Sequence, residues 1–236
     1  MWSGPRNLST AMMYSFGNRA DVSAIDEPFY GAYLKASGAD HPMRDQTLSS
    51  METDAGKVAQ NLKRYSAPYQ YEKHMTHHML EGFPLDWMAE TKNVFLIRHP
   101  KRVLASYRAK REKPKIDDLG FVQQARILEH VIGLGQTPII IDSSDIRRDP
   151  KAALTLLCSQ LSIPFDDAML KWPAGPRPYD GAWAPHWYGS VHSSTGFSKE
   201  TRALPEFDGE WAEMIDQLMP IYEGLAERLT VQVGRD

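Results

Sequence analysis

The stretch WSGPRNLSTAMMYSF, residues 2–16, decides how the fold is interpreted. It predicts a turn that leads directly into a helix, with small and hydroxylated residues around a single arginine, Arg6. A helix N-terminus offers unpaired backbone N–H groups and the positive end of the helix dipole, and both favour an anion. Ser9 or Thr10 can cap the helix and donate to a phosphate, while Arg6 adds a fixed positive fork. An ordinary capped helix with a surface arginine fits these residues equally well.

The loop lacks the Gly-Lys-Ser/Thr ending of the motif that binds nucleoside triphosphates. Arg6 comes early, and no Gly-Lys pair precedes Ser9 and Thr10. The nearest acidic residue at the end of a predicted strand, where magnesium could be held, is Asp142. The loop therefore suits a phosphate-like group that needs no metal, and we predict no metal ligands.

A second anion site is predicted in NVFLIRHPKRVLASYRAKR, residues 93–111. An apolar strand is followed by Arg98, a turn fixed by Pro100, and a helix that carries Ser106. An arginine at a strand end and a serine on the next helix can hold a phosphate from two sides. A solvated basic helix explains the later basic residues, but it explains Arg98 poorly because that residue ends an apolar strand.

Apolar β-rich runs alternate with helical patterns along the chain. The predicted strands are residues 22–26, 69–73, 93–97 and 138–142, and the last two are near-continuous apolar runs typical of strands covered on both faces. The predicted helices are residues 9–18, 55–65, 101–110, 118–133, 151–161 and 209–228. This alternation predicts an α/β fold with a three-layer, mostly parallel sheet flanked by helices. Only three residues precede the first loop, so its strand is either a stub or part of a longer natural chain.

Length and composition favour one domain, residues 1–236. The formal net charge of -3 gives no overall basic field, so we expect no nucleic-acid partner. No apolar run reaches the roughly 18 residues of a membrane span, and no signal peptide opens the chain, so we expect no membrane insertion and a cytoplasmic location. The single cysteine, Cys158, lies in an apolar helical pattern and is expected to be a buried thiol.

Residues 172–205 are dense in proline, glycine, tryptophan and tyrosine and cannot form one long regular element. A long ordered loop in a compact domain is usually functional, so this segment is interpreted as a lid over a ligand, or alternatively as an aromatic packing flap. Four of its rings are candidates to cover a bound group: Trp183, Trp187, Tyr188 and Phe197.

Three segments together resemble the P-loop-type sulfotransferases that use 3'-phosphoadenosine 5'-phosphosulfate (PAPS). RHPKRVLAS, residues 98–106, matches their Arg-x-Pro-x(5)-Ser pattern, and GPRNLSTAM, residues 4–12, resembles their first phosphosulfate loop. IIIDSSDIRRDPKAALTLLCSQLSIPF, residues 139–165, resembles their later strand-and-helix segment. Arg6 stands where many members carry lysine, and Leu8 and Asn7 replace a commonly found glycine and serine. Residues 179–197 resemble a bacterial and plant branch sometimes associated with branched-chain aminotransferases.

The resemblance implies a P-loop nucleotide-hydrolase-like fold and transfer of a sulfuryl group from PAPS to a hydroxyl or amine of a small acceptor. By the same resemblance, Arg6 stabilises the leaving phosphate, and Arg98 and Ser106 hold the 3'-phosphate. The resemblance also implies that the backbone of Asn7, Leu8, Ser9 and Thr10 and the hydroxyls of Ser9 and Thr10 hold the 5'-phosphate, and that Pro5 and Arg6 belong to the same donor-binding loop.

Two residues are candidates for the general base. Glu27 follows the second predicted strand, where several family members use a glutamate, and the alternative for it is a helix N-terminal acid beside Pro28. His74 in YEKHMTHHM also lies at a strand end and has a suitable ordinary pKa. Two rival functions remain open, a P-loop kinase or other phosphotransferase and a non-catalytic relative that binds 3',5'-ADP.

Overall fold

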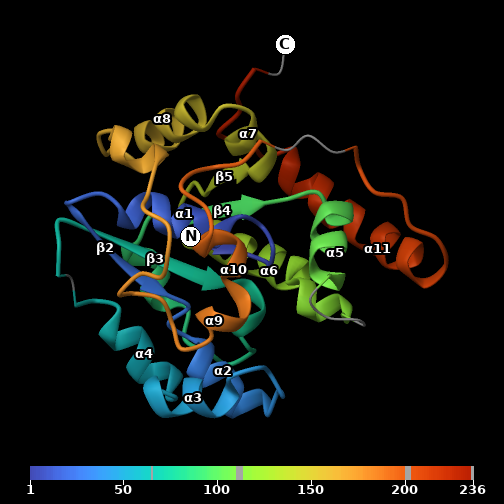
Figure 1. Ribbon diagram of the computed structural model, residues 1–236. Coiled ribbons are helices and arrows are strands. Elements are labelled where there is room, and N and C mark those ends of the chain that lie inside the picture. The colour runs from blue at the N-terminus through green and yellow to red at the C-terminus, as the bar shows by residue number, and fades with distance from the viewer. Residues whose placement is uncertain (65, 110–113, 200–202, 235–236) are drawn as a thin grey trace.

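The computed structural model describes residues 1–64, 66–109, 114–199 and 203–234. At its centre lies a five-stranded sheet, ordered β2-β3-β1-β4-β5, in which neighbouring strands pair in parallel (Figure 1). The strands are β1 (Trp2–Ser3), β2 (Val22–Asp26), β3 (Tyr69–Met75), β4 (Val94–Ile97) and β5 (Ile139–Asp142). The predicted parallel α/β sheet is confirmed, and β1 is a two-residue strand at its centre.

Helices flank the sheet on both sides (Figure 1). They are α1 (Ser9–Gly17), α2 (Tyr30–Ser37), α3 (Arg44–Ser50), α4 (Ala55–Asn61), α5 (Pro100–Arg108), α6 (Phe121–Gly133), α7 (Ser143–Arg148), α8 (Pro150–Leu161), α9 (Ala184–Trp187), α10 (Gly189–His192) and α11 (Gly209–Ala226). Short 3-10 turns η1 (Thr76–His78) and η3 (Ile116–Leu119) also contribute to the site region. Tyr65 and Lys110, the last residues of two predicted helices, lie outside the described residues.

Aspartates set the starts of the two helices that follow β5. Asp142 caps α7 by accepting from the backbone N–H of Ser144 at 2.7 Å, and its other oxygen accepts from the Tyr222 hydroxyl at 2.8 Å. Asp149 caps α8 through the N–H of Ala152, directly before a proline in the first turn. The acidic residue that the sequence offered as a magnesium candidate therefore serves as a helix cap.

Both faces of the central strands are buried. Along β4, Val94 and Leu96 belong to a core cluster with residues of α1 and α8, whereas Phe95 and Ile97 belong to a second cluster with residues of α6. This alternation explains why the strand reads as an unbroken apolar run. Cys158 lies in the first cluster and is buried, as predicted.

The parallel register brings the carboxyl ends of the strands to one edge. Ser3 pairs with Met75 of β3 and with Leu96 of β4, so the residues after these strands begin side by side. The first loop, Glu27 after β2, η1 after β3 and Arg98 after β4 all start at this edge. Ligands of open α/β sheets bind outside this edge, because the loops there diverge.

The aromatic segment from Trp172 to Ser198 carries α9 and α10, which are drawn in orange in front of the sheet in Figure 1. Its Trp183 and Tyr188 side chains are buried. A short bridge between Lys171 and Gly196 closes the base of the segment. Within the described ranges, no helix is both long and apolar enough to cross a membrane.

Candidate functional site

The first loop, Gly4 to Leu8, has an unusual backbone. Arg6 and Leu8 adopt φ values of 61° and 73°, in the left-handed region that favours glycine, and Leu8 is the N-cap residue of α1. A Cβ at Gly4 would lie 2.4 Å from the carbonyl oxygen of Leu119, so a side chain there has no room. The loop is therefore closely fitted to its neighbours and carries local strain at two positions.

Side chains from β4 and α5 hold this loop in place. The Arg98 guanidinium donates to the carbonyl oxygen of Arg6 at 2.7 Å, and the Asn7 amide donates to the carbonyl oxygen of Leu96 at 3.2 Å. Arg6 in turn donates from Nε to the Ser106 hydroxyl at 3.1 Å. The structure thus brings together Arg6, Arg98 and Ser106, which the sequence placed in two separate anion sites.

These residues line a cavity of about 190 Å³, which we call the arginine pocket. Three arginines contribute to it, Arg6, Arg98 and Arg147, and none of its described lining residues is acidic. The rest of the lining comes from the first loop, from α1, from α5 and from the aromatic segment: Asn7, Leu8, Ser9, Thr10, Ala11, Ser106, Trp187, Tyr188, Ser190, Val191, Ser194, Gly196, Phe197 and Ser198. Arg147 and the serines of the aromatic segment were not singled out from the sequence.

The positive charge of Arg6 in the arginine pocket is poorly compensated. Burial, together with the positive charge of Arg98, lowers the pKa of Arg6 from its ordinary value. Within the described part of the chain, Arg6 forms no ion pair with a carboxylate, and its guanidinium contacts Ser106. An anion placed between the two guanidinium groups would remove this repulsion.

A second cavity of about 100 Å³ adjoins the first, and we call it the glutamate pocket. Five residues line both cavities: Arg6, Ser9, Thr10, Trp187 and Tyr188. The other lining residues are Pro5, Glu27, Tyr30, His41, Lys73, Met75, His77 and His78. Arg6 therefore stands at the junction between a cationic cavity and one that contains a carboxylate.

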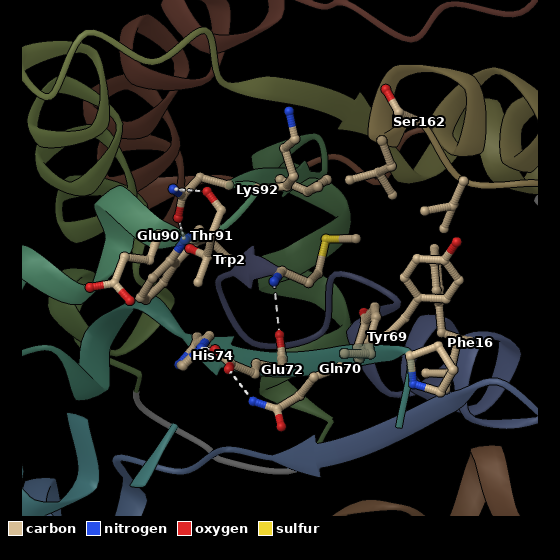
Figure 2. Close-up of a pocket in the computed structure, with 18 of the residues that line it drawn as sticks. Trp2, Phe16, Tyr69, Gln70, Glu72, His74, Glu90, Thr91, Lys92 and Ser162 are labelled. Carbon is tan, nitrogen blue, oxygen red and sulfur yellow. Dashed lines mark hydrogen bonds and ion pairs between the residues drawn. The ribbon is translucent and has the colours of Figure 1, made fainter. Parts of the chain in front are cut away.

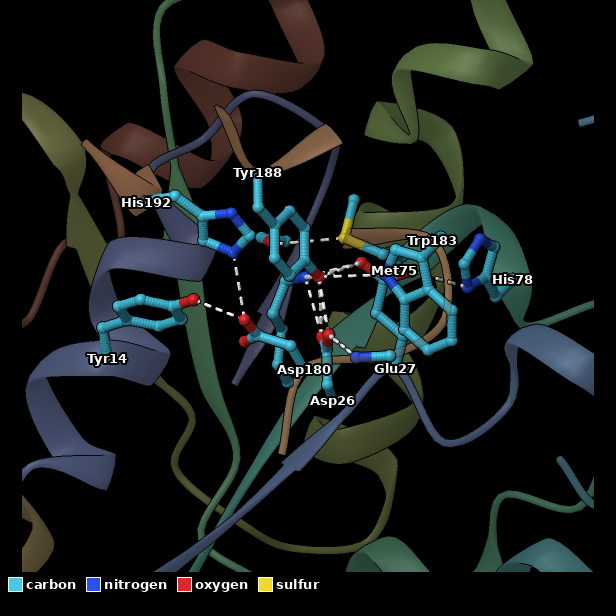
Figure 3. Close-up of polar contacts among 12 residues, drawn as sticks. Tyr14, Asp26, Glu27, Met75, His78, Asp180, Trp183, Tyr188 and His192 are labelled. Atoms are coloured by element: carbon cyan, nitrogen blue, oxygen red, sulfur yellow. Dashed lines mark hydrogen bonds and ion pairs between the residues drawn. The ribbon is translucent and has the colours of Figure 1, made fainter. Parts of the chain in front are cut away.

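Glu27 follows β2 with φ at 44°, another left-handed backbone at a non-glycine residue. Its Oε1 accepts from Lys73 Nζ at 2.5 Å, and Lys73 also donates to Asp26 Oδ1 at 3.0 Å (Figure 3). Burial raises the pKa of Glu27, which Lys73 partly counteracts and Asp26 reinforces. Burial works against the charge of Lys73, but Asp26 and Glu27 raise its pKa above the ordinary value, so Lys73 is held as a cation.

Of the histidines after β3, the structure brings His77 and His78 to the glutamate pocket. His78 Nδ1 lies 3.7 Å from Glu27 Oε2, and its ring stacks on Tyr30 with centroids 4.3 Å apart. Burial lowers the pKa of His78 well below its ordinary value, so the ring is neutral at physiological pH.

His74 is not brought to Glu27. Strand alternation turns it to the other side of β3 from Lys73, where it stacks on Trp2 at 4.4 Å and contacts Glu72 at 2.9 Å. It lines a cavity of about 430 Å³ beside the beginnings of β3 and β4, at the opposite edge of the sheet (Figure 2). That cavity is larger than the other two, but it contains neither Arg6, Glu27 nor Arg98.

No group of three or more His, Cys, Asp or Glu side chains able to hold a metal ion occurs among the described residues. Asp26 was not predicted to contribute to the site, and Lys73 was considered only as an aid to either candidate base. Both occupy strand positions that a periodicity pattern assigns to an ordinary half-buried strand. The only sequence feature that could have indicated their role is that each is a charged residue near the end of a predicted strand.

Comparison with known proteins places these features in context. A family model described as "Sulfotransferase domain" matches residues 1–229. The branched-chain-amino-acid aminotransferase-like proteins 1 and 2 of Arabidopsis thaliana are each 41% identical over 223 residues, which is 94% of this chain. The chain spans about two fifths of the length of these relatives, since the matched part is 40% of each.

Solved structures that match include the sulfotransferase domain from the curacin biosynthetic pathway, at 15% identity and a TM-score of 0.46, with 92% of this chain and 95% of that one covered. Another is the sulfotransferase domain from the Synechococcus PCC 7002 olefin synthase, at 17% identity and a TM-score of 0.45, with 92% of each chain covered.

Proposed function

Because this chain belongs to the family of sulfotransferase domains, we propose that it transfers a sulfuryl group from PAPS to a hydroxyl or amine of a small acceptor. The observation that carries the proposal is the arginine pocket, in which three arginines and a helix N-terminus converge without an acidic residue in the described lining. Such a cavity suits a ligand with more than one phosphate group.

In this proposal the arginine pocket holds the 3',5'-bisphosphate part of the donor. The N–H groups of the first loop and the hydroxyls of Ser9 and Thr10 bind the 5'-phosphate at the start of α1. Arg98 and Ser106 bind the 3'-phosphate. The pocket fits this group, because the charge of Arg98 disfavours that of Arg6 until an anion separates them.

The reaction breaks the bond between sulfur and the bridging phosphate oxygen, forms a bond from sulfur to the acceptor oxygen or nitrogen, and releases 3',5'-ADP. Arg6 stands at the junction of the two cavities, where it stabilises the negative charge that develops on the leaving phosphate. The acceptor occupies the glutamate pocket, and Glu27 takes its proton. A carboxylate whose pKa is raised by burial is better matched to this task than an ordinary one.

The first test is calorimetric titration of the protein with 3',5'-ADP, beside 5'-AMP, ADP and ATP with magnesium. We expect 3',5'-ADP to bind at least about tenfold more tightly than 5'-AMP, since the extra phosphate gains charged hydrogen bonds. Arg228→Ala, which changes an exposed arginine paired with Glu129, is the control and should bind as the native protein does. Preference for ATP with magnesium would instead favour a phosphotransferase, and absence of binding by all four would refute a bisphosphate site.

Transfer itself is tested separately, by following release of 3',5'-ADP from PAPS in the presence of a panel of phenols, alcohols and amines. Binding of 3',5'-ADP with no release above the protein-free rate, for any acceptor or for water, would favour a non-catalytic relative. Acceptor-dependent release would establish the enzyme and identify the acceptor class.

A further inference from the structure

Tyr188 connects the aromatic segment to the residues around Glu27. It follows α9, is buried, and lines both the arginine pocket and the glutamate pocket. Its hydroxyl oxygen lies 2.5 Å from Lys73 Nζ, 3.0 Å from Trp183 Nε1, and 2.7 Å and 2.9 Å from the two oxygens of Asp26 (Figure 3). Glu27 Oε1 lies slightly further away, at 3.3 Å.

The hydrogen-bonding capacity of this hydroxyl is fully used. A phenol has one proton to donate and two lone pairs that can accept. Lys73 and Trp183 can only donate, so they occupy both lone pairs, and the single proton is left for a carboxylate, with Asp26 nearest. Burial, followed by the charges of Asp26 and Glu27, raises the pKa of Tyr188 well above its ordinary value, so the proton stays on the oxygen.

The three protons of Lys73 are likewise all used. They are directed to Asp26 Oδ1, to Glu27 Oε1 and to the Tyr188 hydroxyl. Lys73 therefore holds one oxygen of Glu27 and leaves the other, Oε2, as the atom that can receive a proton. With Lys73 positive and both carboxylates ionised, the cluster carries one net negative charge, which favours proton uptake.

The aromatic segment is fastened at this point by further contacts. The backbone N–H of Gly181 donates to Asp26 Oδ2 at 3.2 Å. Asp180 accepts from the Tyr14 hydroxyl of α1 at 2.6 Å and contacts His192 at 3.0 Å. The segment that covers both pockets is thus attached to the end of β2, directly beside Glu27.

We propose that Tyr188 is a positioning residue for the general base, which acts through Lys73 and Asp26 to hold Glu27 with Oε2 directed at the acceptor. This inference rests on the proposed function, because it takes Glu27 as the base. It adds that the aromatic segment is part of the catalytic apparatus and does more than cover the bound donor. Glu27 is correctly placed only when the aromatic segment packs against the ends of β2 and β3.

The environment of Glu27 defines how this can be measured. The titratable and charged groups that face its carboxylate are Asp26 on β2, Lys73 on β3, His78 on η1 and Tyr188 on the aromatic segment, with Arg6, His41 and His77 across the pocket. The Tyr188 hydroxyl directs its proton to Asp26 Oδ2 and lies 3.3 Å from Glu27 Oε1, so it offsets the negative charge of Asp26 that raises the pKa of Glu27. Its removal should therefore raise that pKa, so the carboxylate is protonated at a higher pH.

The test compares Tyr188→Phe with Tyr179→Phe, which changes a half-buried tyrosine of the same segment that contacts the Tyr14 ring. Carbon-13 NMR of protein labelled at the glutamate carboxyl carbon follows Glu27 directly, with its signal assigned by its loss in Glu27→Gln. We expect the Glu27 midpoint to lie above the ordinary value of about 4.3 and to move higher in Tyr188→Phe only. Identical midpoints in the native protein and Tyr188→Phe would overturn the proposal.

Two further readouts separate this inference from the proposed function. Tyr188→Phe should leave the dissociation constant for 3',5'-ADP within about twofold, because the ring that lines the arginine pocket remains. Its rate of 3',5'-ADP release at saturating PAPS, with water or a phenol as acceptor, should fall by about tenfold or more without a matching change in KM. Failure of the native protein to bind 3',5'-ADP would contradict the proposed function. Normal binding with a normal rate in Tyr188→Phe would contradict the inference alone.

Discussion

The arginine pocket and the glutamate pocket share five lining residues but differ in how their cations are paired. In the arginine pocket, Arg6 donates to the Ser106 hydroxyl and forms no ion pair with a carboxylate of the described residues, and burial together with Arg98 lowers its pKa. In the glutamate pocket, Lys73 is enclosed by two carboxylates and a phenol. The first arrangement leaves positive charge for an anionic ligand. In the second, the carboxylates of Asp26 and Glu27 neutralise the charge of Lys73.

This difference shows that the partners of a buried cation, and not the cation itself, decide what a cavity can do. A lysine whose three protons are all used cannot recruit a phosphate, but it can fix the orientation of a carboxylate. An arginine such as Arg6, which has no carboxylate partner among the described residues, retains its charge for a ligand. Under the proposed function, this separation lets one cavity bind the anionic donor and the other deprotonate the acceptor without interfering with each other.

Glu27→Gln should produce the largest functional effect. It removes the carboxylate of the glutamate pocket and leaves the arginine pocket unchanged. The amide cannot accept the acceptor proton, so we expect the rate of 3',5'-ADP release from PAPS to fall by about 100-fold to 10,000-fold. The dissociation constant for 3',5'-ADP should stay at the native value, because Glu27 does not line the arginine pocket.

The matched control is Glu81→Gln, at an exposed glutamate, which should match the native protein in both measurements. An unchanged rate in Glu27→Gln would show that another group, such as His77 or His78 of the same pocket, accepts the proton.

Arg98→Ala should weaken binding in the arginine pocket and leave the glutamate pocket intact. Hydrogen bonds to charged groups contribute about 1.5–3 kcal/mol, so the affinity for 3',5'-ADP should fall by roughly 10-fold to 100-fold in calorimetry. The affinity for 5'-AMP should fall much less, because that ligand lacks the 3'-phosphate. Equal losses for both ligands would mean that Arg98 acts only by supporting the Arg6 carbonyl oxygen.

The sequence predicted the elements of this site better than their partners. Apolar runs located the strands, and the residues after them, Glu27 and Arg98, were placed at the correct sheet edge. Lys73 and Tyr188 are 115 positions apart, and no local pattern links a strand lysine to a tyrosine of a distant loop. Their pairing depends on the path of the aromatic segment across the sheet edge, which is a tertiary feature.

The histidines illustrate a second limit of the sequence. His74, His77 and His78 are neighbours in one short stretch, yet only the latter two line the glutamate pocket. Where β3 ends and η1 begins decides which ring points to which side, and element boundaries are the least certain part of a pattern-based prediction. The predicted strand ended at residue 73, whereas β3 continues to Met75 and carries His74 to the opposite face.

Acid should lower the free energy of unfolding, because His78 of the glutamate pocket is buried with a lowered pKa. His78 is buried with a lowered pKa, while the unfolded chain binds a proton near pH 6.5. The unfolded state therefore binds more protons below that pH, and the free energy of unfolding should fall by up to about 1.4 kcal/mol per pH unit for this group.

Urea unfolding on either side of pH 6.5 measures this effect. His78→Gln should show a smaller loss of stability on acidification than the native protein, whereas His186→Gln, at an exposed histidine, should show the native loss. Equal pH dependence in all three proteins would mean that His78 titrates as it does in the unfolded chain.

The smallest expected effect concerns the strained backbone that shapes the arginine pocket. At Leu8, with φ at 73°, glycine should be more stable than alanine, because a Cβ costs about 1–2 kcal/mol in the left-handed conformation. Comparing Leu8→Gly with Leu8→Ala isolates this cost, since both variants lose the same leucine contacts. At the exposed helical residue Glu213, the order should reverse, with alanine more stable by about 1 kcal/mol.

Urea unfolding of the four variants would sharpen the contrast between the two pockets. If glycine is favoured at residue 8, the first loop keeps its shape at a cost in stability, and the contacts from Arg98 and Asn7 oppose its relaxation. If alanine is favoured there, the loop backbone relaxes in solution and the arginine pocket is completed only when an anion binds. In that case the titration with 3',5'-ADP should become weaker in Leu8→Gly than in Leu8→Ala, because glycine gives the unbound loop more conformations to lose.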